Sequence, residues 1–230
     1  MKCAPPLIIS HIPKTAGTSL RKLVEELNQD SIFVYDGQLA LANPNINFID
    51  NFRNQKPPSV MMGHFSYGVH RLLGVEPNYA SMFRDPIERI VSLYVHFKTR
   101  KDSPFYNLLA AGMTLADFIS SEITEQTNNH MCRIVAGIAP DAGKVITSRW
   151  LLDLALHNLD RHYIAYGIAE QYEKMIAKVA YALDWNEYEI FRENVGERPQ
   201  FVLDTQAIEV ISKYNQLDME LFSYIKSKCV

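Results

Sequence analysis

The stretch LIISHIPKTAGTSL, residues 7–20, joins a predicted strand to a predicted helix. Leu7 to Ser10 form a short apolar run that ends in a polar residue, which is typical of a buried strand. From Thr18 to Asn28, apolar residues recur at helical spacing. The residues in between include a lysine, a glycine and hydroxyl side chains. Because backbone amides at the start of a helix attract negative charge, this pattern predicts an anion-binding loop.

The same alternation of strand and helix continues along the chain. Further strands are predicted at residues 31–37, 59–65, 78–86 and 162–169. Strands that alternate with helices favour a parallel sheet covered by helices, so we predict an α/β fold. Residues 100–160 contain helical patterns and no strand pattern. We expect this region to be a helical elaboration beside the sheet, and residues 1–230 to form a single domain.

Several helix boundaries are marked by capping residues. Asp85 followed by Pro86 predicts a helix start, and Thr114 with Asp117 forms a capping-box pattern. Helices are also predicted from Ser148 to Leu159 and from the fifth strand to about Leu183. Asp204 is expected to cap a helix that ends at Tyr214, and Asp218 to open the last helix. The segments 42–59 and 194–199 are predicted to be loops because they are rich in Asn, Pro or Gly.

Composition narrows the class of protein. The chain has 230 residues, of which 47% are hydrophobic and 21% charged, as in ordinary globular proteins. The net charge of −3 argues against nucleic acid or an anionic membrane as a general partner. Three widely spaced cysteines favour neither a disulfide framework nor a zinc site, and no apolar stretch is long enough to span a membrane. We therefore expect a protein of the cytoplasm, with no metal and no membrane span.

The loop after the first strand has the chemistry of an anion site. Lys14 offers a positive charge, Gly17 allows the backbone to approach a ligand, and the amides of residues 15–19 open the helix. The residues expected to bind the anion are Lys14, Thr15, Ala16, Gly17, Thr18 and Ser19. In the nucleotide-triphosphate motif GxxxxGK[ST] the lysine follows the glycines, whereas here it precedes the glycine. The alternative is an ordinary capped turn with a surface lysine.

Two other strands end in polar residues that should lie at the same edge of a parallel sheet. Arg84 stands at the end of the predicted strand 78–86, and arginine suits phosphate because its guanidinium is a planar fork. Ser92 lies roughly two turns further along the next helix. His64 comes after the apolar part of the predicted strand 59–65, in the sequence MGHF. It is a candidate general base. The alternatives are a surface arginine and a packed structural histidine. His70 and His11 are weaker candidates for a base, and His11 is expected to orient the loop.

These motifs resemble those of sulfotransferases that use 3′-phosphoadenylyl sulfate (PAPS). HIPKTAGTS is similar to the loop that binds the 5′-phosphosulfate, and RDPIERIVSLY is similar to the motif whose arginine and serine bind the 3′-phosphate. The likeness is to the carbohydrate branch of heparan-sulfate 2-O-sulfotransferase type and its bacterial relatives. NNHMCRIVAG, YIAYGIAEQYEKM and NQLDMELFSYIK extend the resemblance over nearly the whole chain. Those enzymes carry a second histidine two positions before the base. This chain departs from them, because it has Met62 at that position.

The resemblance implies a P-loop-type fold and a role for each motif. Residues 14–19 would bind the phosphosulfate, and Lys14 would also stabilise the leaving group. His64 would be the base, and Arg84 with Ser92 would hold the 3′-phosphate, with no metal. The implied reaction moves a sulfuryl group from PAPS, giving the product PAP, to a hydroxyl or amine of a glycan or small metabolite.

Residues for the acceptor are expected after His64, and the helical region 100–160 is a candidate lid over them. The candidates are Ser66, Tyr67, His70 and Arg71, and Tyr106 is a further ring for a sugar. Three other functions stay open at this point, one of which is a scaffold or interaction protein that no longer uses these motifs. Another is a small-molecule kinase, which would need a triphosphate loop and magnesium ligands. The third is a non-catalytic protein that binds PAPS or a sulfated glycan, which would have no use for a base.

Overall fold

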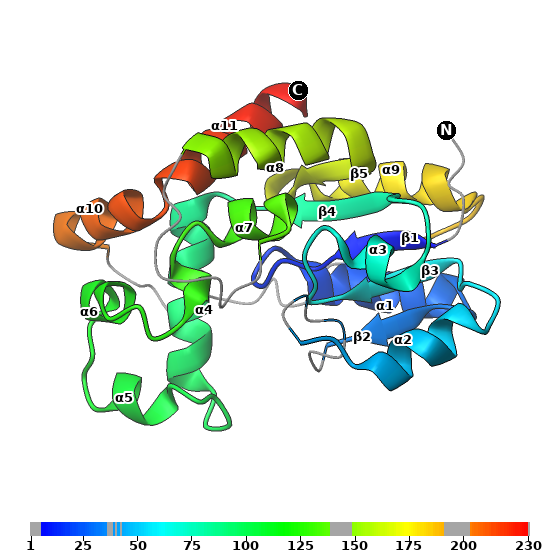
Figure 1. The fold of residues 1–230 in the computed structure, drawn as a ribbon. Coiled ribbons are helices and arrows are strands. Elements are labelled where there is room, and N and C mark those ends of the chain that lie inside the picture. The colour runs from blue at the N-terminus through cyan, green and yellow to red at the C-terminus, as the bar shows by residue number, and fades with distance from the viewer. Residues whose placement is uncertain are drawn as a thin grey trace.

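The computed structural model contains a five-stranded sheet in which every pair of neighbouring strands is parallel. The structure describes residues 6–35, 39, 41, 43–138, 149–190 and 203–229. The strands are β1 (Leu7–Ser10), β2 (Ile32–Val34), β3 (Val60–Gly63), β4 (Tyr79–Phe83) and β5 (Tyr163–Ile168). Their order in space is β2-β3-β1-β4-β5 (Figure 1). The predicted P-loop-type parallel sheet is therefore confirmed.

Helices cover both faces of the sheet because successive strand residues point to opposite sides. In β1, Leu7 and Ile9 pack with α1 (Gly17–Leu27) and α9 (Tyr172–Leu183), while Ile8 packs on the other side. The helices of that other side are α2 (Ile46–Arg53), α3 (Val69–Leu73), α7 (His130–Ala136), α8 (Arg149–His162) and α11 (Gln216–Lys228). The strands are buried on both faces, which explains their continuous apolar runs.

A third apolar cluster lies beside the sheet. It joins α4 (Pro86–Thr99), α5 (Tyr106–Ala110), α6 (Leu115–Ser120) and α10 (Thr205–Tyr214). Figure 1 shows α5, α6 and α10 next to α4, which follows directly after β4. The short turns η1 (Glu125–Thr127) and η2 (Ala169–Gln171) complete the elements of the described residues. Between β4 and β5 the described residues form helices and turns but no strand, so the helical elaboration is confirmed.

The capping residues named from the sequence mostly act as expected. Asp85 accepts hydrogen bonds from the backbone N–H groups of Ile87 at 3.0 Å and Glu88 at 3.1 Å, and Pro86 begins α4. Thr114 and Asp117 form the predicted capping box of α6. The carboxylate of Asp204 accepts from the N–H of Ala207 at 2.7 Å. In each case the cap satisfies amide groups a few residues away, which a sequence pattern can predict.

Other expectations about local structure were wrong. Residues 42–59 were predicted to be a loop, but they contain α2, which Asn45 caps and which buries Ile49 and Phe52 at a spacing of one helical turn. Helix α3 was not predicted. The strands are shorter than predicted, and within the described residues the segment 31–37 pairs only at Ile32–Val34. The loop predicted at 194–199 lies outside the described residues.

Asp218 does not begin α11, as the sequence analysis expected, but caps a different helix. Helix α11 begins at Gln216 with Asn215 as its N-cap, and the buried carboxylate of Asp218 accepts from the N–H groups of Met131 at 3.1 Å and Cys132 at 2.8 Å. These two amides belong to the first turn of α7.

The capping is reciprocal. Asn129, the N-cap of α7, uses its side-chain oxygen to accept from the N–H groups of Leu217 at 2.9 Å and Asp218 at 3.2 Å in α11. The side-chain oxygen of Asn215 in turn accepts from the N–H of Asn129 at 3.2 Å. Asn129, Asn215 and Asp218 are almost fully buried. Each of the two helices therefore supplies the hydrogen-bond partners that the other needs at its start.

Asp218→Ala should destabilise the fold strongly, because it leaves two buried amides without an acceptor. An unpaired buried N–H costs roughly 1–3 kcal/mol, so we expect a loss of about 3 kcal/mol or more in the free energy of unfolding. Asp204→Ala is the matched control, since an ordinary cap contributes about 1 kcal/mol. Urea denaturation of both variants measures the difference. Equal losses in the two variants would show that the reciprocal cap is no more important than a single exposed one.

Candidate active site

Three neighbouring strands end at the same level, and each is followed by a residue with a ring. In the sheet Ser10 pairs with Gly63, and Gly63 pairs with Val34. The next residues along the chain are His11, His64 and Tyr35. The pairing continues past the strand ends, since the N–H of His11 donates to Gly63 O at 2.8 Å and that of His64 to Val34 O at 3.2 Å. The parallel register therefore sets three ring residues in a row at the carboxyl edge.

The three rings contact one another. The centroid of the His64 ring lies 5.0 Å from that of His11 and 4.7 Å from that of Tyr35, and Tyr35 meets His64 edge to face. The hydroxyl of Tyr35 is 3.2 Å from Nδ1 of His11, within hydrogen-bond distance. We call His11, Tyr35 and His64 the ring row. The row holds the candidate base, and the sequence analysis missed Tyr35.

All three rings are uncharged near neutral pH. His64 is an exposed residue, but the loss of solvent where other protein atoms pack against its ring lowers its pKa below the ordinary value. Burial lowers the pKa of His11 further, to about 3, with contributions from His64, Lys14 and Arg21. Burial also raises the pKa of Tyr35 to about 12. An imidazole that is neutral at pH 7 can accept a proton, so His64 has the protonation state that a general base needs.

The predicted anion loop leaves the start of α1 without a side-chain cap. Ala16 occupies the N-cap position with a left-handed backbone (φ 66°) and no capping hydrogen bond, and Lys14 also has a left-handed backbone (φ 72°). Amides at such a helix start are suited to an anion. The Thr15 hydroxyl is buried and donates to Ile12 O at 2.8 Å within the loop, and the role of Thr15 in binding an anion stays a prediction. Thr18 is exposed and Ser19 is buried.

Gly17 is needed here for a reason that the sequence did not reveal. A Cβ atom at this position would lie 1.9 Å from Nε2 of His11. The absent side chain therefore makes room for the His11 imidazole, which packs against the loop. This contact supports the expectation that His11 orients the loop.

Arg84 joins the loop to the end of β4. Its guanidinium donates to Lys14 O at 3.3 Å and forms an ion pair with Glu88 at 3.0 Å, and its side chain is only 9% exposed. Ser92 lies further along α4 and is half-buried. His96 follows Ser92 by one helical turn, and its pKa is lowered by burial and then by Lys14. This face of α4 is therefore turned toward the loop, and Glu88 and His96 are neighbours of the site that the sequence analysis missed.

His130, in the first turn of α7, is a further histidine near the candidate base. Its ring is buried, and its Nδ1 has no hydrogen-bond partner. Burial holds the pKa of His130 well below its usual range, with Arg89 and His64 as further causes. The sequence singled out the segment NNHMCRIVAG but gave this histidine no role.

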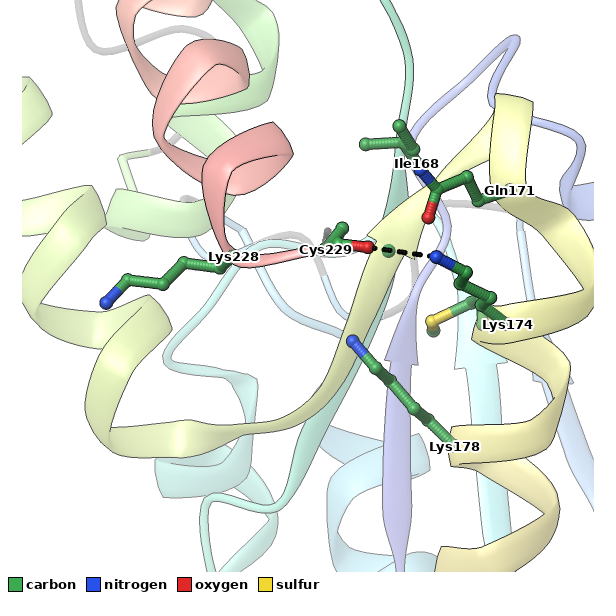
Figure 2. A pocket seen from close by; sticks show the side chains of 8 residues that line it. Ile168, Gln171, Lys174, Lys178, Lys228 and Cys229 are labelled. Carbon is green, nitrogen blue, oxygen red and sulfur yellow. Dashed lines mark hydrogen bonds between the residues drawn. The ribbon is translucent and has the colours of Figure 1, made fainter.

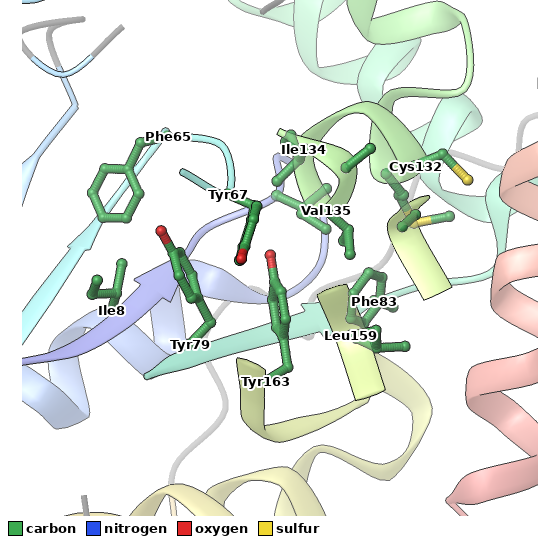
Figure 3. Close-up of a cluster of buried hydrophobic side chains, with 14 of the residues drawn as sticks. Ile8, Phe65, Tyr67, Tyr79, Phe83, Cys132, Ile134, Val135, Leu159 and Tyr163 are labelled. Atoms are coloured by element: carbon green, nitrogen blue, oxygen red, sulfur yellow. The ribbon is translucent and has the colours of Figure 1, made fainter. Parts of the chain in front are cut away.

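Most of the residues suggested for an acceptor are buried. Figure 3 shows Tyr67 beside Tyr79 in the apolar core, with their ring centroids 5.1 Å apart. Nδ1 of His70 lies 2.9 Å from the Tyr79 hydroxyl, and Ser66 is 8% exposed. Arg71 has an exposed side chain. Core packing is thus a sufficient structural role for Tyr67 and His70. That any of the four candidates binds an acceptor stays a prediction.

A separate cavity of about 210 Å³ lies between β5, α9 and the end of α11. Figure 2 shows that Lys174 and Lys178 extend into it from α9, whereas Lys228 turns away. Lys174 donates to Cys229 O at 3.4 Å and Lys178 to Tyr166 O at 2.8 Å. Lys178 thus satisfies one carbonyl of the edge strand β5, and Lys174 links α9 to the end of α11. None of the predicted site residues lines this cavity.

No group of three or more His, Cys, Asp or Glu side chains in the described ranges is arranged to hold a metal ion. No helix there combines the length and the apolar composition that crossing a membrane requires.

Comparisons with known proteins agree with the motifs. Heparan sulfate 2-O-sulfotransferase 1 of Homo sapiens is 26% identical over 193 residues, which cover 77% of this chain and 54% of the relative. The Gallus gallus protein of the same name is 27% identical over 201 residues, with the same coverage. The chain thus spans about half the length of the curated relatives it matches.

The fold has a solved counterpart. A sulfotransferase from Alicyclobacillus acidocaldarius superposes with a TM-score of 0.54 at 13% identity, covering 97% of each chain. The model of the Sulfotransferase family matches residues 3–225 of this chain. The chain therefore belongs to the Sulfotransferase family.

Proposed function

We propose that this protein transfers a sulfuryl group from PAPS to a hydroxyl or amine of an acceptor, with His64 as the general base. The observation that carries the proposal is that His11 links the candidate base to the candidate anion loop. His11 packs against the loop at Gly17 and lies 5.0 Å, centroid to centroid, from His64. A proton acceptor and an anion site thus lie next to each other at one edge of the sheet.

The residues at this edge fit a phosphosulfate. The uncapped start of α1 offers amides to an anion, and Lys14 and Arg84 add positive charge. PAPS would supply a sulfuryl group that is activated because its leaving group is a phosphate. Lys14 would stabilise the negative charge that grows on the leaving oxygen, and Arg84 with Ser92 would hold the 3′-phosphate.

His64 would act on the acceptor. Its neutral imidazole would take the proton of the acceptor hydroxyl while the new bond between sulfur and the acceptor oxygen forms and the bond to PAP breaks. The protein's main contribution would be to position the groups in line and to stabilise charge, as in phosphoryl transfer. The proposal gives no role to a metal ion.

We propose a carbohydrate acceptor, because the similar proteins are named heparan sulfate 2-O-sulfotransferases. The test is incubation with PAPS and a panel of acceptors, including desulfated glycosaminoglycan fragments and small hydroxyl compounds, with products read by mass. Sulfated products from wild type but not from His64→Ala would support the proposal. Phosphorylated products with ATP and Mg²⁺ would favour a kinase, and PAP binding with no sulfated product from any acceptor would favour a binding protein.

His64→Ala should leave PAP binding near the wild-type level and lower kcat by about 100- to 10,000-fold, the usual contribution of a general base. Because burial lowers the pKa of His64, its neutral form persists below pH of about 6.5, and kcat should fall only as pH drops through that lowered pKa. His157→Ala, which removes an exposed histidine of α8, is the control. Steady-state kinetics across pH and calorimetry with PAP measure both effects. Undiminished turnover in His64→Ala would remove this residue from the mechanism.

Arg84→Ala should weaken PAP by about tenfold to 150-fold or more, because a hydrogen bond to a charged group contributes roughly 1.5–3 kcal/mol and arginine can form two. Adenosine 5′-phosphate lacks the 3′-phosphate, so its affinity should change little. Ser92→Ala should show the same selectivity with a smaller loss. Calorimetric titration of both nucleotides measures these affinities.

The control for this series is Arg149→Ala, since Arg149 is an exposed arginine whose ion pairs join α8 to α11. It should bind both nucleotides like wild type. If Arg84→Ala weakened both nucleotides equally, Arg84 would support the loop through Lys14 O instead of reading the 3′-phosphate.

A further inference from the structure

We propose that Tyr35 is a positioning residue for the base, and that it acts on His64 directly and on the anion loop through His11. The inference rests on the proposed function, in which His64 is the base. It adds the residue that follows β2, which no motif of the sequence singled out. In this view the ring row fixes the position of the base relative to the loop.

The direct contact is between two rings. The edge of one ring meets the face of the other at an interplanar angle of 87°, with the centroids of Tyr35 and His64 4.7 Å apart. Edge-to-face contact is a preferred arrangement of rings and limits how far the imidazole can turn. The Tyr35 ring also takes solvent away from the His64 ring where the two meet, and such desolvation lowers the pKa of His64, although His64 remains an exposed residue.

Tyr35 is itself held from another side. The guanidinium carbon of Arg21 in α1 lies 5.2 Å from the centroid of the Tyr35 ring and 5.0 Å from that of Phe33. Arg21 is in turn paired with Glu25 at 2.8 Å on the same helix. A cation near a ring is attracted to it, so Tyr35 is placed between Arg21 and the two histidines.

The indirect link runs through the hydroxyl group. Tyr35 keeps its proton near neutral pH, and its oxygen lies 3.2 Å from Nδ1 of His11. Donation of this proton to Nδ1 leaves the single N–H of neutral His11 on Nε2. Nε2 is also the His11 atom nearest to the Cβ position at Gly17. The Tyr35 hydroxyl therefore fixes both the tautomer and the orientation of the ring that packs on the loop.

The groups that face His64 come from three elements. His11 follows β1, Tyr35 follows β2, and His130 lies in the first turn of α7, where His64 contributes to lowering its pKa. Lys14 and Arg21 are cations that lower the pKa of His11. Tyr35 contacts both histidines of the ring row and stays uncharged near neutral pH. Replacing Tyr35 therefore tests the position and solvation of His64 without removing a charge.

The experiment compares Tyr35→Leu, which removes the ring, with Tyr35→Phe, which removes only the hydroxyl. Two controls match these changes. Tyr188→Leu removes a half-buried ring that packs on Trp185, and Tyr224→Phe removes a hydroxyl that bonds Asp160 at the surface. For each protein, the measurements are histidine titration by NMR with labelled imidazole carbons, PAP affinity by calorimetry, and kcat across pH. His64→Ala and His11→Ala assign the two signals.

In Tyr35→Leu we expect the pKa of His64 to rise toward the ordinary value for histidine and the acid limb of kcat to move to higher pH with it. The plateau value of kcat should fall by about 10- to 100-fold, as for a misplaced catalytic group, while PAP affinity stays within about twofold. Tyr35→Phe should keep the pKa of His64, change the His11 signals and lower kcat by a smaller factor. Both controls should behave like wild type.

A Tyr35→Leu protein with the wild-type His64 pKa and wild-type kcat would overturn the proposal. If that variant does not fold, Tyr35→Phe decides, because unchanged His11 signals and unchanged kcat would overturn the link through the hydroxyl. The NMR titration needs no turnover. If the wild-type protein sulfates no acceptor, the proposed function fails, while the His64 and His11 titrations still show whether Tyr35 positions the two rings.

Discussion

The site depends on the register of the parallel sheet. Three strands with no sequence similarity at their ends stop at one level, because Ser10, Gly63 and Val34 are paired across β1, β3 and β2. Gly63 makes this ending possible, since a Cβ there would lie within bonding distance of Val34 O. A one-residue slip of any strand would send its side chains to the opposite face and break the ring row. The chemistry proposed for this protein is thus set by backbone hydrogen bonds before any side chain of the site is considered.

The reciprocal cap between α7 and α11 holds in place a helix that borders the candidate site. It fixes the first turn of α7, which carries His130, and Figure 1 shows that it brings the end of the chain back over the sheet. Arg89 of α4 is fully buried in the same region and donates to Gln126 O at 2.8 Å. The carboxylate of Asp218 raises the pKa of Arg89 against the effect of burial. Burial outweighs this attraction, since it leaves the pKa of Arg89 lowered and that of Asp218 raised. The cap therefore satisfies two helix starts, and its hydrogen bonds offset part of the cost of burying its members.

The sequence predicted what depends on neighbours along the chain. Asp85, Thr114 and Asp204 each cap amides within a few residues, and the apolar runs of the strands gave the parallel sheet. Asp218 was misplaced because its partners, Met131 and Cys132, are far away in sequence. Helix α2 was missed because its asparagines resemble a loop, although Ile49 and Phe52 lie one turn apart.

The candidate site shows the same division. The sequence motifs named Lys14, Arg84 and His64 as candidate site residues, because each is a charged or polar residue that comes after an apolar strand pattern. Tyr35 has no motif, and its importance comes from the pairing of β2 with β3, which the sequence does not reveal. The role of Gly17 could not be read either, because it depends on where the His11 ring packs.

The electrostatics of this edge connect the anion site to the base. The chain has a net charge of −3, yet Lys14, Arg21 and Arg84 lie around the loop and the ring row. Cations that attract an anion also disfavour protonation of nearby histidines, and Lys14 and Arg21 both lower the pKa of His11. An anion held by the loop offsets part of this positive field, and so makes proton uptake by the neighbouring imidazoles easier. The cations therefore help to keep His11 neutral before an anion binds, and an anion on the loop would raise the proton affinity of His11, which packs against His64.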